Sequence, residues 1–290
     1  MTASDALRPR AEGLAAPLPP LLAHAQQLAR GVVLGEHGRK RPGMGDAFWQ
    51  YRAAQPGDHA RSIDWRRSAR SDTHFVAEKE WQAAQSVSFW VDRGQSMQFA
   101  SDKGLPTKAD RAALLSLALS ILLVQGGERV GLTDMGMRPM TGHIQVNRMA
   151  DALIERRAAD YAVPDVSILP RQARAVFMSD FMADPEPVEA ALTTAADRGV
   201  TGIMLQILDP AEEAFPFDGR TVFHSVGGTL EYETRKAGDL RERYLERLAR
   251  RKERLSYLAR MTGWQYHVHH TDTSASTALL WAFSALEGRA

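Results

Sequence analysis

The sequence predicts an α/β fold built on a doubly wound, mostly parallel sheet. After residue 85, short β-rich runs alternate with long helical stretches, and this alternation is typical of right-handed β-α-β crossovers. The β-rich runs are almost continuously apolar, as strands are when helices cover both of their faces. With 290 residues, 44% of them hydrophobic, the chain is large enough to bury a packed core around such a sheet.

The chain before residue 86 is predicted to have a different character. Residues 1–20 mix small, charged and proline residues, and we expect a flexible arm there. Residues 21–85 are expected to begin with a short helix and to continue as a small β-rich subdomain with tight turns. The helical spacing is carried by Leu21, Leu22, Ala25 and Leu28.

Residues 86–290 are predicted to form the sheet domain. Its strands are expected at 87–91, 129–133, 175–178, 201–208 and 264–268. Its helices are expected at 108–124, 146–157, 187–198, 239–261 and 276–286. Two short β-like pieces around Gly227-Gly228 predict a hairpin excursion near 215–233.

Charge and composition exclude several classes of protein. The formal net charge is +1, so the overall balance indicates neither a nucleic-acid partner nor an anionic membrane surface. The absence of cysteine removes disulfide frameworks, thiolate nucleophiles and Cys-ligated zinc. No run reaches the roughly 18–20 apolar residues of a membrane span, and the N-terminus lacks a signal-peptide pattern. We therefore expect a cytoplasmic protein without a membrane span.

Polar residues that follow the predicted strands are the candidates for a functional site, because doubly wound sheets bind ligands at the carboxyl ends of their strands. The first strand is followed by Asp92 and Ser96, whose oxygen atoms suit a hard divalent cation. Gly94 stands where a second hydroxyl would be needed. The third strand ends at Asp180, a second carboxylate. Two interpretations stay open: these residues hold Mg²⁺ with water, or Asp92 and Asp180 accept hydrogen bonds from loop amides or pair with Arg93.

A second dense motif lies in the β-rich subdomain. Its Pro-Gly-Asp sequence is a turn signal, and its alternating carboxylates and guanidinium groups favour ion pairs that lock a loop. We interpret it as a structural or interaction motif, because no nucleophile with an obvious base recurs nearby. Interleaved acidic residues also argue against a nucleic-acid surface. The motif consists of Arg52, Gly57, Asp58, Arg61, Asp64, Trp65, Ser68 and Arg70.

Three histidines near the C-terminus raise the question of a metal site. His267 and His269 fall on one face of the last predicted strand, and His270 follows. Two imidazoles without a carboxylate nearby in sequence indicate a metal only weakly. We expect an exposed strand end here.

Taken together, these motifs resemble the DUF58 family, bacterial proteins of the von Willebrand factor A superfamily that are often encoded beside MoxR-type AAA+ ATPases. The block from Gly57-Asp58 through Asp64-Trp65 to Ser68-Ala69-Arg70 is similar to the family's "GD..R.IDW..SAR" pattern. The loop after the first strand is similar to its "D.S.SM" version of a metal-ion-dependent adhesion site, and Ser179-Asp180 to its later "SDF". By position alone, Thr141 is the candidate for the superfamily's threonine ligand.

The resemblance implies a von Willebrand factor A-like, Rossmann-like domain and a non-catalytic role. We expect a scaffold that works with a MoxR-type AAA+ ATPase in chaperone-like maturation or assembly of client protein complexes. The edge around Asp92, Ser96 and Asp180 would be the recognition surface, with Mg²⁺ as an optional ligand. The alternative is a Mg²⁺-dependent hydrolase in which Asp92 and Asp180 position the ion and activate water.

Overall fold

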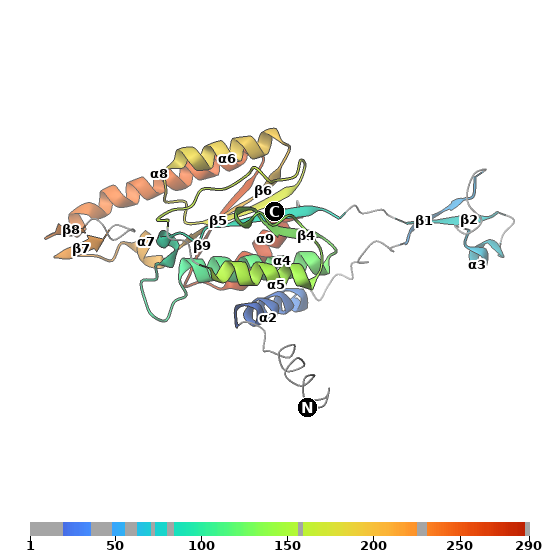
Figure 1. Cartoon of the computed structure of the whole chain (residues 1–290), viewed down its shortest axis with the longest axis horizontal. Coiled ribbons are helices and arrows are strands. Elements are labelled where there is room, and N and C mark those ends of the chain that lie inside the picture. The colour runs from blue at the N-terminus through green and yellow to red at the C-terminus, as the bar shows by residue number, and fades with distance from the viewer. Residues whose placement is uncertain are drawn as a thin grey trace, which may run out of the picture. The chain divides into compact units, whose positions relative to one another are not determined.

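The chain divides into two compact units. The computed structural model describes residues 20–35, 48–55, 63–70, 73–79, 84–155, 159–224 and 231–287, and Figure 1 shows its helices and strands. The larger unit combines Met1–Gly35 with Gln85–Ala290, and the smaller unit spans Glu36–Ala84. Within the described ranges, no helix combines the length and the apolar character that crossing a membrane requires.

A five-stranded parallel sheet forms the centre of the larger unit, in the order β4-β3-β5-β6-β9. Its strands are β3 (Ser86–Val91), β4 (Arg129–Leu132), β5 (Arg174–Ser179), β6 (Thr201–Leu208) and β9 (Gln265–His270). The predicted α/β class with a parallel sheet is confirmed. From β3 the chain passes first to β4 and then back across to β5, so the strand order reverses between β3 and β5. In parallel sheets this reversal is where ligands bind.

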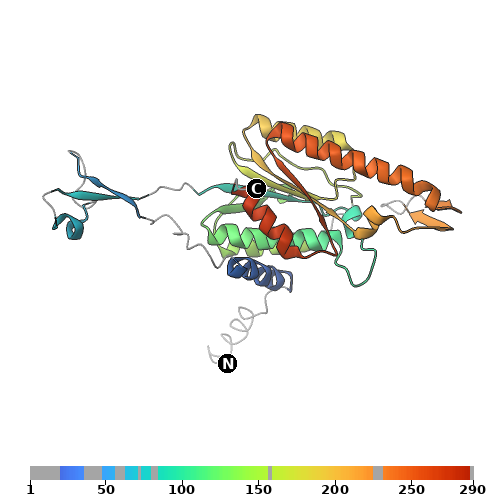
Figure 2. The ribbon, with the colours of Figure 1, turned by 180° about the vertical axis from the view of Figure 1, so that it is seen from behind.

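Helices cover both faces of the sheet (Figures 1 and 2). One face carries α2 (Pro20–Gly35), α4 (Lys108–Gln125), α5 (His143–Ile154) and α9 (Ala275–Leu286), and the other carries α6 (Pro185–Asp197) and α8 (Gly238–Thr262). Side chains of β3 alternate between the two layers: Phe89 and Val91 pack in the first core, whereas Trp90 packs in the second.

Helix α2 belongs to the larger unit. Its apolar side chains are buried against α4 and α9, at Leu22, Ala25, Ala29 and Val32. The sequence prediction grouped this helix with residues 21–85, because the two are contiguous in the chain. In the structure the division falls after Gly35 instead, since the apolar stripe of α2 packs on the sheet domain.

The smaller unit contains an antiparallel pair of strands and one turn of helix. Strand β1 (Phe48–Ala53) pairs with β2 (Phe75–Lys79), and α3 (Trp65–Ser68) lies between them in the chain. Among the described residues, β1 and β2 pair only with each other and with no strand of the larger unit.

Two shorter features complete the larger unit. After β6 the chain forms α7 (Pro210–Ala214), where the sequence prediction had only a strand end, and a capping box with proline in the first turn explains this helix. Strands β7 (Thr221–His224) and β8 (Glu231–Thr234) form an antiparallel hairpin. The predicted turn at Gly227-Gly228 lies outside the described residues.

Candidate functional site

Asp92 occupies the centre of the candidate site, directly after β3. Its amide donates a hydrogen bond to the Met178 carbonyl at 2.8 Å, which ties the loop to the end of β5. Only 2% of Asp92 is exposed. Its Oδ1 accepts the Gly94 amide at 2.8 Å and its Oδ2 accepts the Ser179 hydroxyl at 2.7 Å. Burial raises the pKa of Asp92 to about 6, against the opposing effect of these hydrogen bonds.

The loop after Asp92 is covered by a distant part of the chain. The carbonyl oxygens of Ala159 and Asp160 accept the amides of Gln95 and Ser96 at 2.9 and 3.0 Å. A Cβ atom at Gly94 would lie 2.9 Å from the Asp160 oxygen, so no serine fits there without displacing backbone. The Ser96 hydroxyl is buried and has no hydrogen-bond partner among the residues that the structure describes.

A buried lysine provides the cation of this edge. Lys108 is the first residue of α4 and is 1% exposed. Its ammonium donates to Asp180 Oδ2 at 2.8 Å and to Glu212 Oε1 at 2.6 Å. Burial opposes protonation, but the charges of Asp180 and Glu212 outweigh it and raise the pKa of Lys108 above its ordinary value. Lys108 is therefore a charged bridge between α4, the end of β5 and α7.

Arg93 fixes the other side of the loop. Its guanidinium pairs with Asp134, which follows β4, and donates to the carbonyl oxygens of Ala152 and Glu155 at the end of α5. These carbonyls have no partner inside their own helix. The sequence offered Arg93 as a partner for Asp92 or Asp180; the structure pairs it with Asp134 instead, and the loop-amide alternative describes Asp92.

Thr141 does not belong to this edge. Its neighbour Met140 bridges to Val130 on β4, and Val130 pairs with Val87 on β3, five residues before Asp92. At about 3.3 Å per residue, Thr141 lies roughly 16 Å from the loop, toward the opposite end of the strands. The threonine that does follow β4 is Thr133, which is buried.

A divalent cation does not fit these residues as they are arranged. Asp180 uses Oδ1 for the Met182 amide and Oδ2 for the Lys108 ammonium, and both oxygens of Asp92 are also engaged. In the described ranges, no group of three or more His, Asp or Glu is placed to hold a metal ion. The structure brings Asp92, Ser96 and Asp180 to one edge, and one of these carboxylates, Asp180, is paired with the Lys108 ammonium.

The motif in the smaller unit has a local structural role where it is described. Asp64 caps α3, and its carboxylate accepts the Arg67 amide at 3.0 Å. The Ser68 hydroxyl donates to the Asp64 carbonyl at 2.8 Å and accepts the Phe75 amide at 2.9 Å, joining the turn to β2. Trp65 and Arg70 are exposed.

Four residues of that motif receive no side-chain description. Arg52 lies in β1, and only its backbone position is described. Gly57, Asp58 and Arg61 lie outside the described residues. Any joint role of the full motif stays a prediction.

His269 is not part of an exposed strand end, as the sequence had suggested. It is 3% exposed, and its Nε2 accepts a hydrogen bond from the Arg111 guanidinium at 2.9 Å. His267 stacks on Trp281 with ring centroids 4.7 Å apart. The two side chains are held by different neighbours rather than by a shared ligand.

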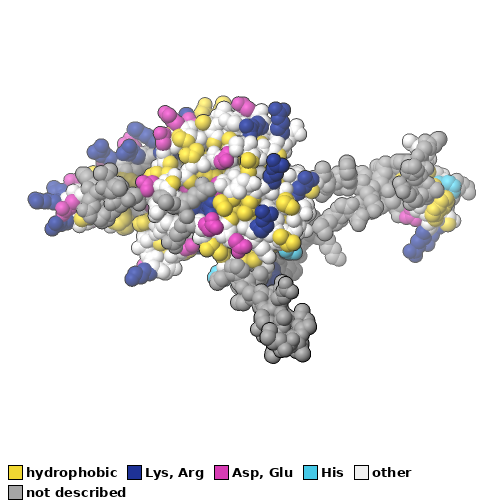
Figure 3. Space-filling model, in the orientation of Figure 1, with side chains coloured by type: hydrophobic (Ala, Val, Ile, Leu, Met, Phe, Trp, Pro, Cys, Tyr) yellow, Lys and Arg dark blue, Asp and Glu magenta, His cyan; other side chains and the backbone are white. Residues whose placement is uncertain are grey.

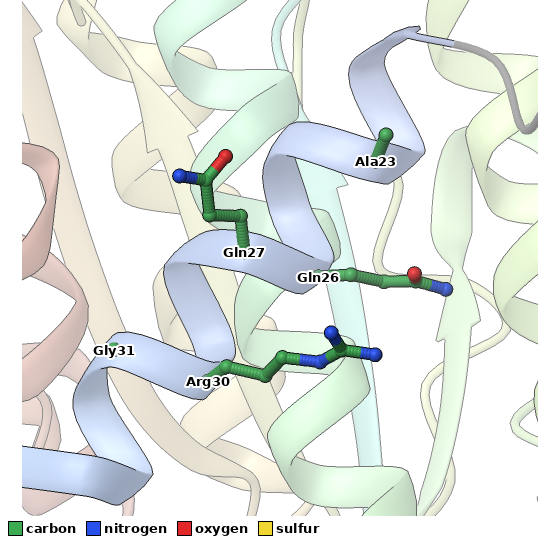
Figure 4. Close-up of a pocket in the computed structure, with 5 residues that line it drawn as sticks. All are labelled: Ala23, Gln26, Gln27, Arg30 and Gly31. Atoms are coloured by element: carbon green, nitrogen blue, oxygen red, sulfur yellow. The ribbon is translucent and has the colours of Figure 1, made fainter.

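Two further features lie on the surface of the larger unit. A hollow on the outer face of α2 is lined by Ala23, Gln26, Gln27, Arg30 and Gly31 (Figure 4). These side chains are mostly small or neutral and belong to one helix, so the hollow offers no convergent chemistry. Lys and Arg side chains gather along α8 (Figure 3), where Arg250 and Arg254 pair with Glu246 and Glu189 at 2.6 and 2.7 Å.

Lys108 and Glu212 are the site residues that sequence reasoning missed. Lysine at the first position of a helix is unfavourable, because the helix N-terminus already carries partial positive charge. A lysine at that position, at the start of an apolar helix, was therefore a usable signal for carboxylate partners. Glu212 was detectable from the Asp-Pro-Ala-Glu capping pattern at 209–212.

A parallel sheet with helices on both faces, and with buried charges where strand order reverses, defines an α/β protein of the doubly wound class. The chain belongs to the family described as "Protein of unknown function DUF58", whose model matches residues 50–254. Uncharacterized proteins of Mycobacterium tuberculosis and Mycobacterium bovis are each 28% identical over 230 residues, which cover 73% of this chain and 71% of each relative.

Solved structures give a more distant likeness. The conserved hypothetical protein BatB from Bacteroides thetaiotaomicron is 14% identical, with a TM-score of 0.39. An aerotolerance-related membrane protein from Bacteroides fragilis is also 14% identical, with a TM-score of 0.40. Each comparison covers 71% of this chain and 100% of the other.

Proposed function

We propose that this protein is a non-catalytic interaction module of von Willebrand factor A-like architecture, which works with a MoxR-type AAA+ ATPase on client proteins. Two features support this architecture. Asp92 and Asp180 follow the neighbouring parallel strands β3 and β5, where the strand order reverses. The loop that begins at Asp92 also carries Ser96. The ATPase partnership comes from the family resemblance, since these proteins are often encoded beside such ATPases.

The single observation that carries the proposal is that the carboxylates of Asp92 and Asp180 are both engaged by groups of the protein itself. Asp180 is paired with Lys108, and Asp92 accepts hydrogen bonds from Gly94 and Ser179. A metal-dependent hydrolase needs open coordination positions and a carboxylate or imidazole aimed at bound water. The buried groups here act instead as supports that hold the loop in one shape, which favours recognition over hydrolysis.

The recognition surface would consist of the exposed neighbours of these buried groups. Asp92, Ser96 and Asp180 are too buried to touch a partner, whereas Gln95 is exposed. Phe99 is 39% exposed, and its ring lies 5.9 Å from the Lys108 ammonium. Tyr161, next to the Asp160 carbonyl that covers the loop, is also 39% exposed. Exposed aromatic side chains over a rigid support are typical of interface hot spots.

Binding to the MoxR-type ATPase of the same genome tests this proposal. The full chain is immobilised, and the ATPase is titrated with Mg²⁺-ATP present throughout. We expect Phe99→Ser and Tyr161→Ser each to weaken binding by about tenfold or more, as truncated hot spots do. Tyr257→Ser is the matched control, because Tyr257 is 46% exposed on α8, and it should bind as the wild type does.

Results of two kinds would contradict the proposal, in the binding assay and in an activity screen. One is equal binding by the wild type and the two loop-edge variants, or no binding to the ATPase at all. The other is turnover in a phosphatase screen with Mg²⁺ or Mn²⁺ that disappears in Asp92→Ala, which would favour the hydrolase.

A further inference from the structure

We propose that the Lys108 ammonium is the resident cation of the carboxyl edge, in the role that a divalent metal would otherwise have, and that its removal uncovers a divalent-cation site. This inference goes beyond the proposed function, and it holds whether or not an ATPase is the partner. It concerns only the chemistry of Lys108, Asp180 and Glu212.

The burial of Lys108 costs free energy that other contacts must offset. A fully buried lysine is rare, and burying an unpaired ammonium costs several kcal/mol in order of magnitude. The N-terminus of α4 adds to that cost, because its free amides already present positive charge. Lys108 is nevertheless 1% exposed. Only strong attraction from opposite charges compensates for such a placement.

That attraction comes from carboxylates on two other segments. Asp180 follows β5 and Glu212 lies in α7, and both contact the same ammonium, at 2.8 and 2.6 Å. Glu212 is itself fixed, because its other oxygen accepts the Asp209 amide at 2.9 Å. One cation thus joins three separate parts of the chain, as a bridging metal ion does.

The loop after Asp92 does not complete a metal site. At Gly94, the Asp160 carbonyl occupies the space that a serine side chain would need. Ser96 keeps a buried hydroxyl with no partner in the described part of the chain. The same edge therefore lacks the second hydroxyl, at position 94, and carries the positive charge of Lys108.

Removing the ammonium would leave two carboxylates facing a vacated space. Divalent cations such as Mg²⁺ and Mn²⁺ bind through one or two carboxylates and fill their other positions with water. A small neutral side chain at position 108 would leave room for the ion and its water. A methionine would fill that room with an apolar chain, and an arginine would keep the positive charge.

Mn²⁺ binding to the full chain and to single variants tests the proposal, by electron paramagnetic resonance of free Mn²⁺ and by thermal unfolding. We expect the wild type, Lys108→Arg and Lys108→Met to show no specific site at millimolar Mn²⁺. Lys108→Ala should bind one Mn²⁺ at least about tenfold more tightly than the wild type, and Mn²⁺ should raise its unfolding midpoint by several degrees. Adding Asp180→Asn to Lys108→Ala should abolish this gain.

Several outcomes would overturn the proposal. Specific Mn²⁺ binding by the wild type that Asp180→Asn removes would show that the lysine does not replace a metal. A folded Lys108→Ala variant without increased binding would show that no latent site exists. If Lys108→Ala folds only in the presence of Mn²⁺, the proposal is supported. If Lys108→Ala folds under no condition, the Mn²⁺ titration of the wild type decides whether the proposal stands. Specific binding that Asp180→Asn removes would overturn it, and the absence of such binding would support it.

Discussion

At Gly94, an added Cβ atom would come within 2.9 Å of the Asp160 carbonyl oxygen and 3.1 Å of Asp92 Oδ1. The first of these atoms belongs to the backbone, so it cannot turn aside as a flexible side chain can. We therefore expect Gly94→Ser, which introduces the hydroxyl of the family pattern, to destabilise the protein by about 1–3 kcal/mol, as other overpacked sites do. Urea unfolding of the variant measures this loss.

The control for Gly94 separates a steric effect from a general effect of the serine substitution. Gly31 is exposed in α2, and no atom lies within 4 Å of a Cβ placed there. Gly31→Ser should therefore unfold at the same urea concentration as the wild type, or at a slightly higher one. A Gly94→Ser variant as stable as the wild type would mean that the segment over the loop moves aside easily.

His269 makes stability depend on pH. Burial, and then the charge of Arg111, lowers the pKa of His269 to about 4 from an ordinary value of 6.5. Well above pH 6.5 the imidazole is neutral in both the folded and unfolded chains, so it does not affect the free energy of unfolding. As pH falls from 6.5 toward 4, only the unfolded chain takes up the proton, and stability decreases.

The size of this effect can be measured with a neutral substitute. Glutamine at position 269 can accept from Arg111 and donate to Thr273, which are the contacts of the histidine. Between about pH 7 and pH 5, the wild type should lose about 2 kcal/mol more unfolding free energy than His269→Gln. Equal losses in urea unfolding at the two pH values would show that His269 takes up its proton while folded.

Among the elements, the end of α5 depends on one side chain from outside the helix. Arg93 donates to the Ala152 and Glu155 carbonyls and pairs with Asp134, whose side chain is only 5% exposed. Arg93→Met removes the donor and leaves a buried negative charge without this guanidinium. We expect a loss of about 3–5 kcal/mol in unfolding free energy, the range for breaking buried ion pairs.

A double-mutant cycle tests that explanation. Arg93→Met with Asp134→Asn should lose clearly less stability than Arg93→Met alone, because the second change removes the buried charge. Arg148→Met, on an exposed position of α5, should change stability by no more than about 0.5 kcal/mol. Simple additivity in the cycle would rule out an energetic link between Arg93 and Asp134.

The same helix shows where sequence patterns stop being sufficient. The β-rich runs were placed well, and the run at 201–208 coincides with β6, because local apolar patterns specify buried strands. Helix α5 was predicted at 146–157 but spans His143–Ile154. The carbonyls at its end are bound by Arg93, which is distant in the chain and leaves no local signal. Likewise, Lys108 is 72 residues from Asp180 and 104 from Glu212, so their contact was beyond any local pattern.

At the scale of the whole molecule, the larger unit is formed by two stretches of chain that flank the smaller one. Helix α2 buries its apolar side chains on α4 and α9, and neither strand described within residues 36–84 joins the five-stranded sheet. We therefore expect a variant in which a flexible Gly-Ser linker of about 15 residues replaces residues 36–84 to keep the fold of the larger unit. Its thermal midpoint should lie within a few degrees of the wild type, as followed by circular dichroism.

Removal of α2 should instead destabilise the larger unit. Removing residues 1–35 uncovers the surface that Leu22, Ala25, Ala29 and Val32 now cover, and it should cost roughly 5 kcal/mol from the burial of those side chains. Closing the chain with a linker costs far less, since doubling a loop's length changes its closure free energy by only about 0.6 kcal/mol. If the linker variant unfolds while the truncated one stays folded, the division after Gly35 is wrong and α2 belongs with the smaller unit.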